Sequence, residues 1–371
     1  MTDARRWLLI LALNTGLAAT AQAIVPGEPR FSDREEYEYA GQHGLEPNCR
    51  VSVYCYRVLV PVVLEQIPVD ATWRWRAFQV LANTFAGTIL AVTTGALAGG
   101  WPAAVLATLM VQSSFGFTFT AYDPYSADPA VFVFAAIITW CWINNRVGGA
   151  FAVGLIGVFA KETVALVSAS TALAALISRQ PRQWRWWLGQ AAVVMATLLG
   201  FHWVMDTYFG WGITANPAAK FSEGSWLAIW WANNPNVLRK LFNLFMPFGF
   251  GWLYAAAGLW TAAPRLRQLA LGAIAPMLAL NYVQNPERAL GNAFFVIVPL
   301  ATVALIRVPW PLALAAVVTN GALTAKVGTS TAWLPSASLL FGAAAVSAAL
   351  VGWQLWLTGR RAERLVPQDT I

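Results

Sequence analysis

The chain has little charge, little histidine and little cysteine. Only 11% of its 371 residues are charged, whereas soluble proteins carry roughly a quarter of their residues as charges. This deficit excludes a soluble domain and a disordered chain. Two histidines and three cysteines exclude a zinc ribbon and a dense disulfide scaffold. The sequence is instead 58% hydrophobic, with 20 Trp, 20 Phe and a mean hydropathy of +0.55, which predicts an integral membrane protein.

Motifs that drive common membrane machines are also missing. The sequence has no Gly-x-x-x-x-Gly-Lys-Ser/Thr element, so the chain has no ATP-binding loop to power transport. It has no His-Glu-x-x-His pair, and His43 and His202 stand alone. The sequence therefore indicates no cofactor, and a divalent metal is possible but not indicated.

Long apolar stretches dominate what is present. A membrane-spanning helix needs roughly 20 apolar residues, and several of these stretches are shorter, which predicts broken or partly re-entrant helices. We expect an all-α polytopic protein of ten to twelve spans, forming one integral membrane domain over residues 1–371. The expected spans cover residues 7–25, 77–98, 102–121, 129–143, 148–160, 163–178, 186–205, 241–260, 268–283, 292–306, 310–325 and 336–357.

The net charge of +7 reflects topology. With Arg5 and Arg6 placed inside, the inner segments contain only Asp3, Glu363 and Asp369 as acids. Basic residues concentrate in short inner loops of membrane proteins, so this distribution predicts a multi-pass inner (cytoplasmic) membrane protein and no nucleic-acid partner. The inner basic residues are Arg5, Arg6, Arg146, Arg179, Arg182, Arg185, Arg265, Arg267, Arg307, Arg360, Arg361 and Arg364.

The first apolar stretch has two interpretations. Residues 1–23 combine Arg5-Arg6, an apolar run and Ala21-Gln22-Ala23, which is typical of a secretory signal. The same stretch also fits an uncleaved first span. Both interpretations deliver residues 26–76 to the outside as a first outer loop with short surface helices. A second, larger outer loop is expected over residues 206–240.

The first outer loop is the most polar part of the chain. Ser32 and Glu35 have the spacing of a capping box, which predicts a short helix that stops near Gly41 or Gly44. Asp33 has two interpretations here. It either complements the dipole of this helix or serves as a catalytic carboxylate.

The cysteines favour one disulfide. Cys49 and Cys55 lie in the first outer loop, on the side where oxidising conditions permit a disulfide. We expect them to pair, although two free thiols remain an alternative. Cys141 lies within an apolar span, where packing is the expected role.

Three further charged clusters are expected on the outer side. They contain Asp123 with Asp128, Lys161 with Glu162, and Glu287 with Arg288. Asp128 precedes Pro129, as in an ordinary helix start. Charges near membrane depth are costly and usually face a cavity or a partner, so these clusters predict a site on the outer face.

Several of these elements together carry a resemblance to a known family. An acidic residue after the first span, an Arg element leading into the next helices, and acidic and basic pairs at later helix starts resemble C-type (GT-C) membrane glycosyltransferase-like proteins. The resemblance covers residues 1–180 and 285–305; Asp33 departs from it by lying in an acid-rich run without an Asp-Asp or Asp-Glu pair. The matching elements are Asp33-x-x-x-Tyr37-x-x-Ala40, Tyr56-Arg57-Val58-Leu59-Val60-Pro61, Asp128-Pro129, Lys161-Glu162 and Glu287-Arg288.

The resemblance implies transfer of a hexose or pentose from a polyprenyl-phosphate carrier to an acceptor at the periplasmic or extracellular face. Asp33 is then the expected catalytic base, with Glu36 and Glu35 as alternatives, because the acceptor hydroxyl must lose a proton. Cations would stabilise the phosphate that leaves. The residues expected to bind substrate are Tyr37, Arg57, Asp123, Asp128, Lys161, Glu162, Glu287 and Arg288.

Two other function classes fit the same composition. A transporter or flippase of a lipid or small solute would also need many spans and intramembrane charge. The charged first loop has no counterpart in the second half, which weighs against an inverted repeat. A non-catalytic membrane assembly subunit would leave the charged loops as solvated surface.

Overall fold

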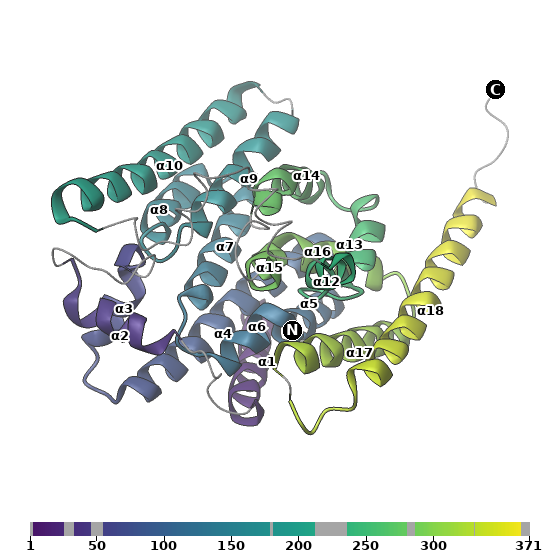
Figure 1. Cartoon of the computed structure of the whole chain (residues 1–371). Coiled ribbons are helices and arrows are strands. Elements are labelled where there is room, and N and C mark those ends of the chain that lie inside the picture. Colours follow the sequence, from purple (N-terminus) through teal and green to yellow (C-terminus); the bar gives the residue numbers. More distant parts are fainter. Residues whose placement is uncertain are drawn as a thin grey trace.

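The computed structural model describes residues 3–25, 33–45, 55–178, 181–211, 236–279, 286–329 and 331–364. Within these ranges every regular element is a helix, as Figure 1 shows. The helices are α1 (Asp3–Ile24), α2 (Arg34–His43), α3 (Leu59–Glu65), α4 (Ala71–Ala98), α5 (Trp101–Ser113), α6 (Phe115–Tyr122), α7 (Asp128–Ile143), α8 (Val147–Gly157), α9 (Thr163–Ile177), α10 (Pro181–Phe209), α12 (Val237–Phe245), α13 (Gly251–Leu259), α14 (Pro264–Ala279), α15 (Pro286–Leu290), η5 (Gly291–Ala293), α16 (Phe294–Leu305), α17 (Trp310–Thr329) and α18 (Ala337–Arg364).

Six helical segments in the described residues are long and apolar enough to cross a membrane. A seventh is obtained if α5 and α6, bent by 46° at their junction, count as one span. These segments indicate a multi-pass membrane protein. The expected ten to twelve spans are not confirmed, because α7, α8 and α9 contain only 16, 11 and 15 residues.

The helices run between two ends of the molecule. At the start of α7, Asp128 pairs with Lys161, which precedes α9, and with Arg288 of α15. At the end of α7, the Trp142 indole donates to the Arg265 carbonyl oxygen at 2.9 Å, beside the start of α14. We call these the Asp128 end and the Arg265 end.

Close helix contacts build the core between these ends. All residues of α16 are buried. A Cβ on Gly258 of α13 would lie 1.9 Å from the Leu300 carbonyl oxygen, and one on Gly272 of α14 would lie 2.5 Å from the Ser170 carbonyl oxygen. Small residues let membrane helices approach closely, so these two glycines fix the α13–α16 and α14–α9 contacts.

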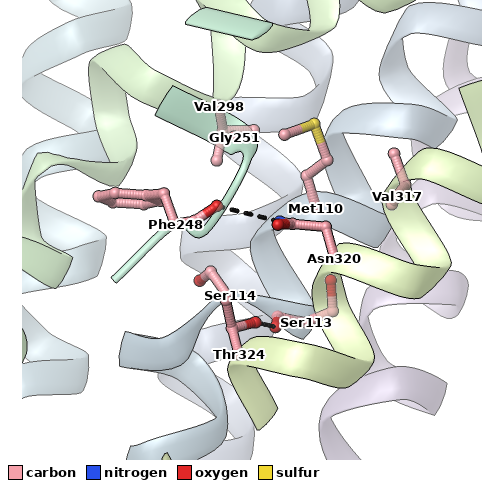
Figure 2. A pocket seen from close by; sticks show the side chains of 9 residues that line it. All are labelled: Met110, Ser113, Ser114, Phe248, Gly251, Val298, Val317, Asn320 and Thr324. Atoms are coloured by element: carbon pink, nitrogen blue, oxygen red, sulfur yellow. Dashed lines mark hydrogen bonds between the residues drawn. The ribbon is translucent and has the colours of Figure 1, made fainter. Parts of the chain in front are cut away.

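Two helix breaks meet at α17 (Figure 2). Asn320 donates to the Phe248 carbonyl oxygen at 3.0 Å and accepts from the Phe250 N–H at 2.8 Å, between α12 and α13. One turn further, Thr324 donates to the Ser113 carbonyl oxygen at 2.9 Å, where α5 ends. Backbone groups freed at membrane depth need such partners. The apolar stretch 241–260, expected as one span, is therefore interrupted in the middle.

The predicted short helix of the first outer loop is α2. It follows Asp33 and ends before Gly44, which has a φ of 56° that glycine adopts readily. The Asp33 side chain makes no capping hydrogen bond to this helix. Ser32, the other half of the predicted capping box, lies outside the described residues, as do 212–235 of the expected second loop.

Candidate functional site

Asp128 is the centre of a buried charge network at the Asp128 end. Its side chain is 3% exposed. One carboxylate oxygen pairs with the Lys161 ammonium, and the other lies 2.6 Å from Arg288 Nε. A buried carboxylate is costly unless it is paired, and two cations compensate this one.

Arg288 is held by all three of its side-chain nitrogens. Besides Nε on Asp128, Nη2 donates to Ser126 Oγ at 2.7 Å and Nη1 lies 3.4 Å from Asp33 Oδ2. The guanidinium carbon is 5.1 Å from the centroid of the Phe119 ring. The Asp33 contact is the longest of the three polar contacts, so it is the one that a ligand can replace most easily.

Arg57 forms the second half of the network. Its Nε and Nη2 bind the two Glu162 oxygens at 3.1 and 2.7 Å, and Nη1 donates to the Tyr37 hydroxyl at 3.2 Å. Burial would lower the pKa of Arg57, but the Glu162 carboxylate raises it well above its usual value. Burial would likewise raise the pKa of Glu162, and Arg57 and Lys161 lower it to about 2. Burial raises the pKa of the Tyr37 hydroxyl. Arg57 and Glu162 are therefore ionised and Tyr37 is neutral near pH 7.

The two halves are continuous along the chain, because Lys161 and Glu162 are consecutive residues. We call the set the site cluster. It contains three acids and three bases from five segments far apart in sequence: Asp33, Arg57, Asp128, Lys161, Glu162 and Arg288.

The structure separates the carboxylates of α2. Asp33, with a side chain 25% exposed, reaches the site cluster through Arg288. Glu35 is exposed and Glu36 is partly buried, and within the described residues neither forms an ion pair. Of these three carboxylates, Asp33 is therefore the one that contacts the site cluster, and its side chain does not cap the helix.

The remaining predicted residues have mixed outcomes. Asp123 is buried at the end of α6. Cys55 is buried and disulfide-bonded, and Cys141 is a free thiol. Cys49, the predicted partner of Cys55, and the Glu287 side chain lie outside the described residues.

Ser126 was not predicted as a functional residue. It is fully buried, accepts from Arg288, and its Oγ also accepts from the Asp128 N–H at 3.1 Å. The signal that could have revealed it is its place two residues before Asp128-Pro129, where a Ser side chain can bond to the backbone of a helix start.

An aromatic layer lies next to the site cluster. Tyr37 packs on Trp75 at 5.5 Å between ring centroids, and Trp75 packs on Tyr125 at 5.9 Å. The Arg34 guanidinium lies 4.9 Å from the Tyr125 ring centroid. These rings fix α2 against the starts of α4 and α7.

A separate polar cluster surrounds Tyr56, next to Arg57. The Tyr56 hydroxyl donates to Asp206 of α10, and its ring stacks on His202 with 4.0 Å between centroids. Burial raises the pKa of Tyr56, and the Asp206 carboxylate raises it further. His202, isolated in sequence, thus packs against the segment that carries Arg57.

Two apolar grooves flank α3 beside the site cluster. The first groove, of about 430 Å³, is bordered by Val58, Val62 and Phe159. The second, of about 290 Å³, is bordered by Val63 and by the α7 residues Ala130 and Phe134. The Leu59 N–H donates to the Phe159 carbonyl oxygen at 3.0 Å, which connects α3 to the segment before Lys161.

Among the described residues, no three His, Cys, Asp or Glu side chains lie close enough together to hold a metal ion.

Comparison of the chain with protein-family models, curated proteins and solved structures found no match. The function is therefore inferred from the geometry of the site cluster.

Proposed function

We propose that this protein is a membrane glycosyltransferase with a GT-C-like fold that transfers a sugar from a polyprenyl-phosphate carrier to an acceptor hydroxyl. The observation that carries the proposal is the site cluster, in which an accessible carboxylate and three cations adjoin apolar grooves. A lipid phosphate-sugar needs both polar and apolar surfaces, because its reactive head is charged and its carrier is a hydrocarbon.

Asp33 is the proposed general base. Asp128 and Glu162 have both carboxylate oxygens engaged by cations at short distance, whereas Asp33 makes one contact of 3.4 Å. A carboxylate that is less tightly paired can accept the proton of the acceptor hydroxyl as that oxygen attacks the anomeric carbon.

The cations are proposed to bind the carrier phosphate. Arg288 keeps N–H groups on Nη1 and Nη2 beyond those in its hydrogen bonds, and Phe119 and Ser126 hold its plane in place. Arg and Lys stabilise the negative charge that develops on a departing phosphate. The phosphate would take the place of Asp33 on Arg288, which frees the base as the donor binds.

The grooves beside α3 give the carrier a place to lie. Both are lined almost entirely by apolar side chains, and one begins at Val58, the residue after Arg57. A prenyl chain in either groove would bring the attached phosphate to Arg57 or Lys161.

The charge distribution supports an orientation for the protein. Basic residues gather at the Arg265 end. Arg6 in α1 lies beside Gly100 and Trp101, Arg265 and Arg267 lie at the start of α14, and Arg307 follows α16 by two residues. Basic residues favour the cytoplasmic side, so the site cluster would face the periplasm or exterior. Topology reporters placed after Arg185 and near Gln42 should report opposite compartments. If both reporters lie in the same compartment, this orientation is wrong.

The direct test is transfer by purified protein in liposomes. Undecaprenyl-phosphate hexoses and pentoses are supplied as donors together with an oligosaccharide that offers free hydroxyls as acceptor, and release of the carrier phosphate is measured. Asp33→Asn and Arg288→Gln should lose transfer, whereas Glu38→Gln, a carboxylate change on the same helix, should keep it. Lipid analysis of a deletion strain should show an accumulated polyprenyl-phosphate sugar. Carrier turnover equal to that of the wild type in Asp33→Asn, Glu36→Gln and Arg288→Gln alike would refute the proposal.

A second candidate, transport of a lipid or small solute, is favoured by the paired helix breaks in Figure 2. Transporters bind substrates at broken helices. A small cavity lies there, with room for about one water molecule and lined by Ser113, Ser114, Asn320 and Thr324 among apolar residues, so the helices would have to separate to admit a solute. Asn320→Leu should abolish transport of a labelled lipid across liposomes if this cavity carries the function. Transport would be favoured over glycosyl transfer by two results together. Asn320→Leu would lose lipid transport, and the wild type would transfer no sugar from the polyprenyl-phosphate donor.

A further inference from the structure

A third apolar groove, distant in sequence from the site cluster, lies between α1 and α17. Its volume is about 370 Å³. Leu17 and Ala21 of α1 and Val25 just after it line one wall, Val318 and Ala322 of α17 line the other, and Leu109 of α5 also lines the groove. We call it the α1–α17 groove. Val318 is 56% exposed, so the groove opens to the side of the molecule, where lipid lies in a membrane protein.

The mouth of this groove combines an aromatic side chain with a cation. Trp333 lines the mouth, is 60% exposed, and donates from its indole to the Ile24 carbonyl oxygen at 3.2 Å. Tryptophan prefers the level of the lipid headgroups. The Lys326 ammonium donates to the carbonyl oxygen of Thr331, another lining residue, at 2.7 Å.

Lys326 differs from the site cations in its partners. Lys161, Arg57 and Arg288 each contact a carboxylate, whereas Lys326 forms no ion pair within the described part of the chain. An ammonium has three N–H groups, and a single carbonyl oxygen leaves donors and a full positive charge at the groove mouth. Lys326 therefore has donors and charge that a ligand in the groove can use.

We propose that the α1–α17 groove binds an anionic phospholipid, with an acyl chain along Ala21 and Val318 and the phosphate on Lys326. The apolar walls require a hydrocarbon chain, which excludes a free phosphate ion. The Lys326 ammonium selects an anionic headgroup over a zwitterionic one, because basic residues near the bilayer surface attract anionic lipids. This site is independent of the proposed glycosyl transfer.

Lipid retention by the full chain tests the proposal. The protein is placed in nanodiscs of phosphatidylcholine alone or mixed with phosphatidylglycerol, released, and its bound lipids are counted by native mass spectrometry. The wild type should retain phosphatidylglycerol preferentially. Lys326→Gln should lower that preference about fivefold, the share of one basic residue at an anionic lipid surface. Arg267→Gln, an exposed cation at the Arg265 end, is the matched control and should change nothing.

A second pair of variants tests the groove itself. Val318→Trp places a large ring in the groove and should reduce retention of both lipids. Val346→Trp, an equally large change at an exposed position of α18, should leave retention unchanged. Equal phosphatidylglycerol retention by the wild type and Lys326→Gln would overturn the headgroup assignment. Undiminished lipid retention in Val318→Trp, or a wild-type protein that carries no bound lipid, would overturn the groove assignment.

Discussion

The two ends of the molecule use charge in different ways. At the Asp128 end, Arg57, Lys161 and Arg288 are paired with carboxylates in a largely buried network. At the Arg265 end, Arg265 donates to the carbonyl oxygens of Trp142 and Ile143 at 2.8 and 3.2 Å, where α7 ends. Neutralised, partly buried charge marks a place where chemistry can occur, whereas basic side chains on helix ends orient a protein in the membrane.

Asp128→Asn should have the largest effect of any change at the Asp128 end. The substitution leaves Lys161 and Arg288 without their shared buried anion, and breaking a buried ion pair costs about 3–5 kcal/mol. We expect poor expression and a strong fall in unfolding temperature in detergent. Asp128→Asn combined with Lys161→Met should recover part of that loss, because it removes one of the two stranded charges. No recovery in the double variant would contradict the pairing.

Asp33→Asn should separate chemistry from folding at the same end. Removal of a general base typically lowers a rate by about 10²–10⁴-fold, so transfer should nearly disappear. Asp33 makes one long contact and no capping bond, so the unfolding temperature should hardly move. Normal transfer in Asp33→Asn with loss in Glu36→Gln would move the base to Glu36.

Lys161→Met should weaken donor binding while the protein still inserts into the membrane. Asp128 keeps Arg288 as its partner in this variant, so the carboxylate stays paired. We expect KM for the donor to rise more than kcat falls, since a phosphate contact is lost and the base is intact. Unchanged donor KM would leave Lys161 with the structural role of holding Asp128.

Part of this site could be predicted from sequence because each charged residue interrupts or borders an apolar run. Asp128, Lys161 and Arg288 stand out in that way, and the structure brings them together. Their pairing could not be predicted: Arg288 and Asp33 are 255 positions apart, and no local pattern specifies such a contact. Ser126 was missed because a serine in a turn is ordinary until its partner is known.

The fold shows the same division between local and tertiary signals. Helix type follows from the apolar runs, and the end of α2 follows from Gly44, whereas no capping hydrogen bond from Asp33 marks its start. The interruption between α12 and α13 was not predicted, because residues 241–260 were interpreted as one apolar run, although Pro247 and Gly249 within it are signals of a break. The break depends on Gly249, with a φ of 52°, and on Asn320, which satisfies the freed backbone groups from another helix.

Arg265→Gln should sharpen the comparison from the other end. It removes two charged hydrogen bonds to the last carbonyls of α7 and a cation at a helix C-terminus, a loss of about 1–2 kcal/mol. Transfer by the folded protein should stay at the wild-type level, because the site cluster lies at the opposite end. Chemical unfolding measures the loss of stability, and the liposome assay measures the rate of transfer. A selective loss of transfer would show that the two ends are coupled.

Glu38→Gln should have the smallest effect, although it also removes a charge at the Asp128 end. Glu38 pairs with Arg34 at 2.9 Å on the surface of α2, one helical turn apart, with side chains 25% and 36% exposed. Pairs of this type contribute about 0.3–0.5 kcal/mol, and salt screens them. The unfolding temperature and transfer rate should both stay near the wild-type values, and the small difference should vanish at high salt. If Glu38→Gln lost as much transfer as Asp33→Asn, the loss would reflect a disturbance of α2 as a whole and not the removal of the Asp33 carboxylate. The surface pair and the site cluster would then not differ in function.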